Sequence, residues 1–516
     1  MRCDAPTRRH DTWSRARTVY HLCSKTVLLC DCAHHHKGNF GDTVHILKAM
    51  LIPPCSVLQE FAKCLFKKQE TYAMSSPTHS GPFRIVDHLV ECQHIREYPG
   101  ATANEQEDEL YLAVKQYIPL DNPNPQPGDV TILATHANGF PKELYEPLWE
   151  ELHARSKANG FRIRSIWIAD VAHQGQSYVT NEDVLGNDPS WFDHPRDLLH
   201  LVNVKRKEMP RPIVGIGHSF GGAHLAKLCL MHPRLIHTLV LLDPVIQRQT
   251  TQLDPLSADK RKLAMAKTTQ LSTYRRDIWP SRKAAAEGFS RSPFYQAWDS
   301  RVLDRWIKYG LRELPTAIHQ LPSEASKDGE QPVTLTTPLH QEVFTFSRPN
   351  YDGPPGKDVP VDRVTHPDLD PNHLGSFPFY RPEPSRIFAE IPHLRPSVMY
   401  IFGGKSDMCL PEMMADKMAN TGVGLGGSGG AAAGRVRDVY LKEYGHLLAQ
   451  EAPTECAEAA SKWLGQELRR WREEDQSFRE QWSRKSKVEK ITIDPRWKEH
   501  VPAPVRNKRG PSKPKL

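Results

Sequence analysis

The sequence predicts an α/β protein in which helices cover both faces of a mostly parallel sheet. Short apolar segments with the composition of strands alternate along the chain with amphipathic segments of helical spacing, as expected for parallel sheets. One of these strands runs through a glycine-rich turn around Ser219 directly into a helix. After the sixth strand the alternation stops over residues 245–392 and then resumes. A cap or lid inserted between the sixth and seventh strands accounts for this interruption.

Eight segments are predicted as strands because they are short, apolar and bounded by turn residues. They cover residues 83–94, 111–117, 130–135, 165–170, 213–216, 238–242, 397–402 and 436–441. Helices are predicted where apolar residues recur every three or four positions. They cover residues 142–158, 191–207, 223–230, 258–279, 293–310 and 453–470. The later part of the insertion is irregular and rich in proline.

The turn around Ser219 has the G-x-S-x-G pattern, Gly217-His218-Ser219-Phe220-Gly221. In the nucleophile elbow of an α/β-hydrolase fold, a sharp turn raises the serine hydroxyl to the top of the sheet, where a base can reach it. Larger side chains at Gly217 and Gly221 would clash with the strand or the helix. An isolated match could be an ordinary glycine-serine loop, but here a strand precedes it and a helix follows it. The sequence therefore predicts an α/β-hydrolase fold with Ser219 as nucleophile.

A serine hydroxyl needs an adjacent base, and in this fold the order along the chain is serine, acid, histidine. His446 lies just past the last predicted strand and before the final helix, so we expect it to be the base. Asp407 follows the seventh strand and Asp243 follows the sixth. We favour Asp407 as the acid that orients the imidazole and keep Asp243 as the alternative.

Two backbone N–H groups are expected to stabilise the oxyanion. One belongs to Phe220, the residue after the nucleophile, and the other comes from the loop after the third strand, at Asn138. The segment around Asn138 could also be a simple strand-ending turn. Its place between a strand and a helix favours the functional interpretation.

The predicted cap is rich in aromatic residues, which are Trp279, Phe289, Phe294, Tyr295, Trp298, Trp306 and Tyr309. Such residues belong to a core more often than to a substrate wall. Together they still suggest an apolar substrate tunnel. We therefore expect hydrolysis of an ester or thioester of an apolar acyl group through an acyl-enzyme, a mechanism that needs neither metal nor organic cofactor.

Two alternatives stay open. The same triad could transfer an acyl group or hydrolyse a carbon–carbon bond. The fold could also serve as a non-catalytic binding protein, although such a protein has no need of all three triad residues.

Composition excludes several other classes. The net charge of +7 comes largely from basic residues between 496 and 515, a pattern typical of a solvated tail, so we expect no nucleic-acid partner. No apolar run approaches the length of a transmembrane helix.

Six of the ten cysteines precede residue 65 and the rest are scattered, which favours a reducing compartment without a disulfide framework. The Cys30–His36 segment lacks the usual zinc spacing, so no metal site is predicted.

Three regions are predicted along the chain. Residues 1–73 form an extension that we expect to be poorly ordered, and residues 74–470 form the hydrolase domain with its cap at about 245–392. Residues 471–516 continue the last helix into a basic tail. The glycine-rich run 422–434 is expected to be a flexible loop.

The segments 136–147, 217–222 and 445–447 resemble the fungal AB hydrolase-1 family over about residues 74–470. The chain is similar to a yeast peroxisomal lipase and to hydrolases of host-selective toxin clusters. The resemblance implies the fold and the serine mechanism but no particular substrate. Such proteins often end in a peroxisomal tripeptide, and this chain ends in Pro514-Lys515-Leu516, which differs from Ser-Lys-Leu at the first position. The resemblance thus implies a peroxisomal import receptor as partner, with a cytoplasmic location as the alternative.

Overall fold

The computed structural model describes residues 78–248, 268–321, 330–351, 361–369, 378–501 and 503–504. By its contacts the chain divides into two units, Met1–Ala73 and Met74–Leu516, and every described residue lies in the second. The expectations for residues 1–73, for the Cys30–His36 segment and for the terminal tripeptide therefore lie outside the described residues.

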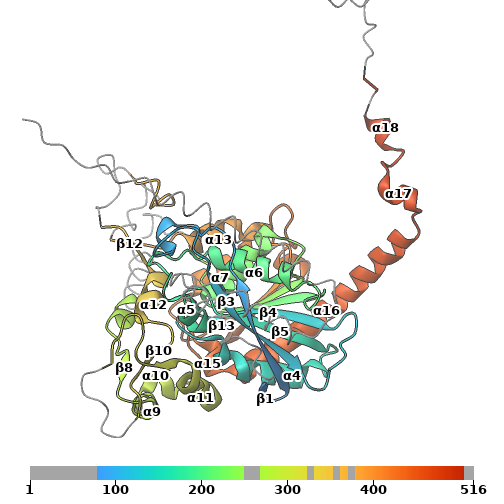
Figure 1. Cartoon of the computed structure of the whole chain (residues 1–516). Helices are drawn as coiled ribbons and strands as arrows, with labels where there is room; N and C mark the ends of the chain where they lie inside the picture. The colour runs from blue at the N-terminus through green and yellow to red at the C-terminus, as the bar shows by residue number, and fades with distance from the viewer. Residues whose placement is uncertain are drawn as a thin grey trace, which may run out of the picture. The chain divides into compact units, whose positions relative to one another are not determined.

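A nine-stranded sheet in the order β1-β2-β3-β5-β4-β6-β7-β13-β14 forms the centre of the second unit (Figure 1). Its strands are β1 (Thr78–Ser80), β2 (Phe83–Glu91), β3 (Tyr111–Pro119), β4 (Val130–Thr135), β5 (Ile163–Ala169), β6 (Ile213–His218), β7 (Thr238–Leu242), β13 (Ser397–Gly403) and β14 (Val436–Leu441). The strands from β1 to β5 in this order pair antiparallel, and those from β5 to β14 pair parallel. The predicted mostly parallel sheet is confirmed, with β1 as an additional strand.

The central strands are buried along their whole length, as expected for parallel strands covered on both faces. Alternate residues of β4 enter two separate cores: Ile132 and Ala134 face one, and Leu133 faces the other. The helices α4 (Glu146–Ser156) and α16 (Pro453–Ser483) cover the first face. The second face is covered by α6 (Asp193–Val204), α7 (Phe220–Met231) and α13 (Glu383–Glu390).

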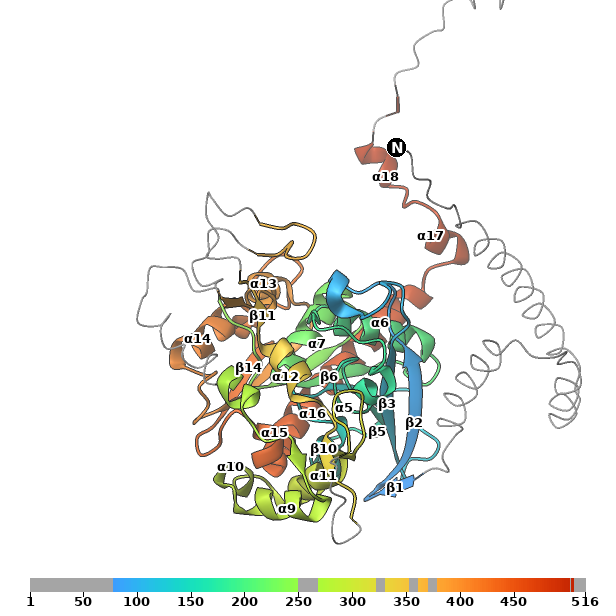
Figure 2. The ribbon, with the colours of Figure 1, turned by 60° about the vertical axis from the view of Figure 1, so that its left-hand side comes forward.

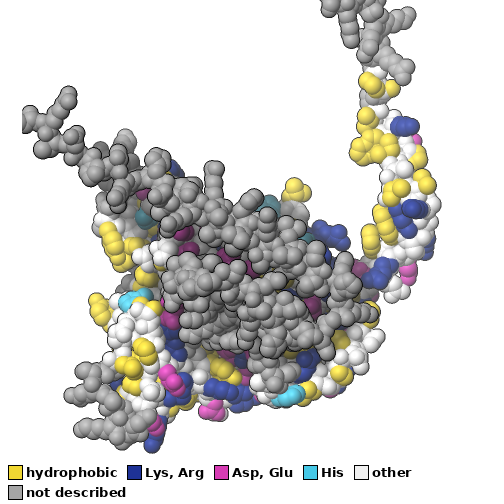
Figure 3. All heavy atoms as spheres, in the orientation of Figure 1, with side chains coloured by type: hydrophobic (Ala, Val, Ile, Leu, Met, Phe, Trp, Pro, Cys, Tyr) yellow, Lys and Arg dark blue, Asp and Glu magenta, His cyan; other side chains and the backbone are white. Residues whose placement is uncertain are grey.

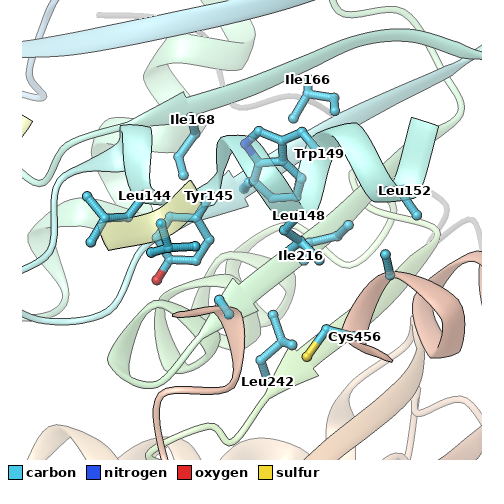
Figure 4. Packing of buried hydrophobic residues seen from close by; sticks show 14 of the residues in the cluster. Leu144, Tyr145, Leu148, Trp149, Leu152, Ile166, Ile168, Ile216, Leu242 and Cys456 are labelled. Carbon is cyan, nitrogen blue, oxygen red and sulfur yellow. The ribbon is translucent and has the colours of Figure 1, made fainter. Parts of the chain in front are cut away.

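Figure 4 shows the first core, in which α4 lies across the sheet. Leu148, Trp149 and Leu152 of this helix pack among Ile166 of β5, Ile216 of β6 and other buried residues. Cys456 of α16 belongs to the same cluster. These contacts hold the end of β6, and therefore the turn that follows it, in a fixed place in the sheet.

The insertion between β7 and β13 contains short helices and strands. These are β8 (Ile278–Trp279), α9 (Arg282–Arg291), α10 (Pro293–Gln296), α11 (Ser300–Tyr309), β9 (Leu311–Glu313), β10 (Val333–Leu335), α12 (Leu339–Phe346), β11 (Arg348–Pro349) and β12 (Phe379–Tyr380), followed by α13. In both ribbon views α9, α10 and α11 lie at the opposite end of the domain from α13, which packs on α7 (Figures 1 and 2).

Two predicted cap helices differ from the structure. The helix expected at 293–310 is divided into α10 and α11, because Asp299 caps α11 by accepting a hydrogen bond from the N–H of Arg301. The helix expected at 258–279 falls partly outside the described residues, and its last part is instead β8, which pairs with β10.

The last helix is longer than predicted. The helix α16 runs to Ser483 and is followed by α17 (Lys487–Ile491) and α18 (Trp497–His500). Beyond Trp471 most of its residues are exposed, and hydrophobic and basic side chains lie next to each other along these C-terminal helices (Figure 3). None of the helices within the described ranges combines the length and apolar character needed to cross a bilayer.

The glycine-rich run 422–434 is held by backbone hydrogen bonds. Gly422 N–H donates to the carbonyl oxygen of Ile391, and Ser428 N–H donates to that of Leu394. A Cβ on Gly427 would lie 2.4 Å from the carbonyl oxygen of Gly422, so glycine is required at this close approach. Within the described residues this run is therefore a tied loop rather than a freely extended linker.

Candidate active site

Ser219 occupies a strained turn between β6 and α7, with φ 58° and ψ −125°. The flanking glycines make the turn possible. A Cβ on Gly217 would lie 2.8 Å from Thr135 Oγ1, and one on Gly221 would lie 2.5 Å from the carbonyl oxygen of His136. Thr135 Oγ1 also donates a 2.8 Å hydrogen bond to the carbonyl oxygen of Gly221, which ties the end of β4 to the turn. The predicted elbow geometry is present.

His446 lies in hydrogen-bonding distance of both Ser219 and Asp243. Its Nε2 is 2.8 Å from Ser219 Oγ, and its Nδ1 is 2.6 Å from Asp243 Oδ2. An ionised carboxylate can only accept, so Nδ1 carries the proton donated to Asp243. Nε2 is then free to accept the hydroxyl proton of Ser219. The three residues follow β6, β7 and β14, at the carboxyl end of the parallel strands.

Asp243 is completely buried and richly hydrogen-bonded. Besides His446, it accepts a hydrogen bond from Ser406 Oγ at 2.5 Å and one from the thiol of Cys409. Burial alone would raise the pKa of this carboxyl, but the hydrogen bonds and charge of His446, together with the bonds from Cys409 and Ser406, lower the pKa below its usual value. The carboxylate is therefore ionised at neutral pH.

The expectation that Asp407 takes this position is wrong. Asp407 is exposed, whereas its neighbours Ser406 and Cys409 turn inward and bind Asp243. Both aspartates follow a parallel strand at the same edge of the sheet, so their sequence contexts are alike. The alternative residue, Asp243, adopts φ 42° directly after β7, and its carboxylate meets His446.

Of the expected oxyanion residues, Phe220 follows Ser219 directly and Asn138 lies in the loop after β4. Phe220 begins α7, where helix N–H groups are unpaired and favour negative charge. The Asn138 side chain is engaged elsewhere: its Nδ2 donates to the carbonyl oxygen of Glu342 at 3.0 Å, and its Oδ1 accepts from Gln174 Nε2 at 2.6 Å. Within the described part of the chain, neither backbone N–H donates to a protein acceptor.

His218 and Tyr145 form a connection that sequence reasoning missed. His218 Nε2–H donates a 2.8 Å hydrogen bond to the carbonyl oxygen of His446, and its Nδ1 accepts one of 2.9 Å from the Tyr145 hydroxyl. That hydroxyl in turn accepts the N–H of Ala137 at 2.7 Å. Burial, and then the proximity of His446, lower the pKa of His218 to about 3, so the ring is neutral. The histidine at the second position of the G-x-S-x-G pattern was the only available signal.

A buried ion pair supports the loop that carries Asn138. Lys142 Nζ lies 2.7 Å from Asp170 Oδ2, and the backbone N–H groups of Lys142 and Gln176 also donate to this carboxylate. Gly139 N–H donates to Gln174 Oε1 at 2.9 Å. The loop after β4 and the loop after β5 are thus held together.

The cap aromatics form a core rather than an open wall. Trp279, Phe289, Trp298 and Trp306 are buried, and Phe294 is exposed. Phe140, from the loop after β4, makes edge contacts with Trp298 and Trp306 at centroid distances of 5.5 and 5.8 Å. The cap is therefore packed directly onto the loop that carries Asn138. Among the described residues, no group of three or more histidine, cysteine or acidic side chains is arranged to hold a metal ion.

A family model described as the alpha/beta hydrolase family matches residues 132–459. A type I acyl-CoA thioesterase of Penicillium brevicompactum is 42% identical over 445 residues, which cover 84% of this chain and 99% of the relative. A type I acyl-CoA thioesterase of Penicillium roqueforti is 40% identical and covers 85% and 100%.

More distant similarities agree in fold. An abhydrolase domain-containing protein of Alternaria alternata is 27% identical over 259 residues, covering 50% of this chain and 84% of the relative. Among solved structures, the peroxisomal alpha-beta-hydrolase Lpx1 of Saccharomyces cerevisiae aligns with a TM-score of 0.53 at 16% identity, covering 75% and 90% of the two chains.

Proposed function

The chain belongs to the alpha/beta hydrolase family and is a hydrolase of the ester and thioester type, and we propose that it hydrolyses acyl-CoA thioesters with Ser219 as nucleophile. The observation that carries this proposal is the hydrogen-bond chain from Ser219 Oγ through His446 to the buried Asp243. Its thioester part rests on two relatives, 42% and 40% identical over nearly their whole length, that are named as acyl-CoA thioesterases.

In the first half-reaction, Ser219 Oγ attacks the thioester carbonyl while His446 Nε2 takes the hydroxyl proton. Asp243 holds the imidazole tautomer and stabilises the imidazolium. The backbone N–H groups of Phe220 and Asn138 stabilise the oxyanion. Collapse of the tetrahedral intermediate breaks the C–S bond, and His446 returns the proton to the leaving thiolate.

In the second half-reaction, water attacks the acyl-enzyme. His446 takes a proton from that water and then returns it to Ser219 Oγ, which leaves as the hydroxyl. The products are a carboxylic acid, free thiol and unchanged enzyme.

The test is a panel of acyl-CoA thioesters and matched oxygen esters, in which thiol release and acid formation are both measured with the full chain. We expect acid and thiol in equal amounts, with Ser219→Ala reducing the rate at least a thousandfold. Thiol release without free acid would instead indicate acyl transfer. Fluorophosphonate should label the wild type but not Ser219→Ala, and equal labelling of both would remove the serine mechanism.

For the cell compartment, we propose peroxisomal import through the terminal Pro514-Lys515-Leu516. The support is its Lys-Leu ending and the likeness to the yeast hydrolase that is named as peroxisomal. A fluorescent protein fused ahead of the whole chain should be punctate, and deletion of the last three residues should make it cytosolic. A diffuse signal from both fusions would reject this address.

A further inference from the structure

Four neighbouring parallel strands begin in register at the edge of the sheet opposite Ser219. Thr238 of β7 pairs with Val214 of β6 and with Ser397 of β13, and Val398 pairs with Val436 of β14. The strands therefore start side by side, about 4.8 Å apart. Strand lengths of five to seven residues put this edge roughly 20 Å from the triad.

Each of these four strands is preceded by an arginine. Arg211 comes two residues before β6, Arg234 four residues before β7, Arg395 two residues before β13 and Arg435 one residue before β14. All four line one cavity of about 520 Å³, whose volume is typical of a small-molecule site. Four arginines that precede successive strands of the sheet thus surround one cavity.

Three of the four arginines have no carboxylate partner within the described ranges. Arg435 is engaged, at 3.2 Å from Glu467 and 2.7 Å from Glu474. Arg211, Arg234 and Arg395 form no ion pair with a described residue. The acidic residues that line the cavity, Glu474 and Asp475, pair with Arg435 and Arg479, so the other three arginines leave an excess of positive charge there.

Aromatic side chains of α16 complete the wall. Trp471 is buried, and the Arg211 guanidinium lies 6.0 Å from its ring centroid. Phe478 also lines the cavity and is 57% exposed. Guanidinium forks bind phosphate oxygens in pairs, and exposed aromatic faces accept flat rings.

We propose that this cavity binds a small molecule carrying two adjacent phosphate groups, at a second site separate from the triad. Several arginines around one cavity, each able to pair with two phosphate oxygens, favour two linked phosphates over a single anion. A diphosphate could come from a nucleotide or from inorganic pyrophosphate, and both share this chemistry. The inference goes beyond hydrolysis at Ser219 and does not depend on it.

The test is isothermal titration calorimetry of the full chain at low salt with pyrophosphate, ADP and adenosine as probes. We expect pyrophosphate and ADP to bind and adenosine not to bind, with affinity falling as salt rises. The double variant Arg234→Ala/Arg395→Ala should weaken binding at least tenfold. Arg162→Ala is the matched control, because Arg162 precedes β5 at the same edge of the sheet but does not line the cavity.

Tighter binding of ADP than of pyrophosphate would assign the site to nucleotides, and the reverse would assign it to inorganic diphosphate; both results support the proposal. Absence of binding by both probes at millimolar concentration overturns it. So does an unchanged affinity in the double variant, or an equal loss in Arg162→Ala. The thermal midpoint and fluorophosphonate labelling of each variant check that the exposed substitutions leave the fold intact.

Discussion

The side chain of His218 holds the backbone of His446: its Nε2–H donates a 2.8 Å hydrogen bond to the carbonyl oxygen of the proposed base. Through Tyr145 the same ring is connected to the N–H of Ala137, beside the proposed oxyanion residue Asn138. The loop that carries the proposed base and the loop that carries the proposed oxyanion residue are therefore fixed to each other. His218 is a positioning residue, since its buried side chain acts through the backbone of His446 and the hydroxyl of Tyr145.

Replacing His218 with alanine should lower kcat about tenfold and leave KM nearly unchanged. The substitution removes the donor to the carbonyl oxygen of His446 and the acceptor of the Tyr145 hydroxyl proton, which costs about 1–3 kcal/mol. Steady-state kinetics and guanidinium unfolding measure the two effects. Tyr145→Phe keeps the ring and removes only the hydroxyl, so its effect on kcat should be smaller. A raised KM with unchanged kcat in His218→Ala would contradict the positioning role.

Asp243→Asn should reduce kcat by about 10⁴, because an amide cannot hold the imidazole in the tautomer that accepts the serine proton. Asp407→Asn should stay within about twofold of the wild type, since Asp407 is exposed. The comparison uses kcat of the two variants on the same thioester. A larger loss in Asp407→Asn than in Asp243→Asn would reverse the assignment of the acid.

Stability should fall as the pH is lowered from about 6.5, because five histidines near the site are buried. These histidines are His136, His173, His194, His218 and His224. Burial is the main cause that lowers the pKa of each, and it lowers the pKa of His173 and His218 to about 3. Below pH 6.5 the unfolded chain binds protons that the folded chain does not. Each histidine then removes up to about 1.4 kcal/mol of stability per pH unit.

Guanidinium unfolding at pH 7 and pH 5 measures this dependence. Both ring nitrogens of His224 lack a hydrogen-bond partner in the described part of the chain, so His224→Leu should remove one titrating group and flatten the dependence. His232→Leu, at an exposed position after α7, serves as the control and should leave the slope unchanged. An identical slope in His224→Leu and the wild type would show that this histidine does not contribute.

Two glycine substitutions should have opposite effects on stability. Gly221→Ala places a Cβ 2.5 Å from a backbone oxygen at the elbow, and we expect a loss of at least about 3 kcal/mol in the free energy of unfolding together with loss of labelling at Ser219. Gly288→Ala lies inside α9, where a Cβ would meet nothing within 4 Å, and should stabilise by about 0.5–1 kcal/mol. Thermal unfolding of both variants checks the contrast; similar destabilisation by both would contradict the steric argument.

Much of this architecture follows from local sequence patterns. The eight strands were predictable because buried parallel strands are continuous apolar runs, and Ser219 was predictable because the elbow needs glycines at fixed offsets. His446 was predictable from its place after the last strand.

Other features depend on distances that no local pattern encodes. Asp243 and Asp407 follow adjacent strands, and only the inward turn of Ser406 and Cys409 distinguishes them. The bond from His218 to His446 joins residues 228 positions apart. The group of four arginines around one cavity is visible only once the strand register is known, because its members are scattered over more than 200 residues.

Asp243 and His446 are 203 residues apart, with the whole cap between them. Ser219 precedes His446 by 227 residues. A ribosome therefore finishes Ser219 long before the strand that delivers His446 exists. Until β13 and β14 dock beside β7, the Ser219 hydroxyl lacks its hydrogen bond to His446, the proposed base. The proposed mechanism thus makes reactivity at Ser219 a late event of folding, and we expect a probe that labels this serine to report molecules whose sheet has been completed.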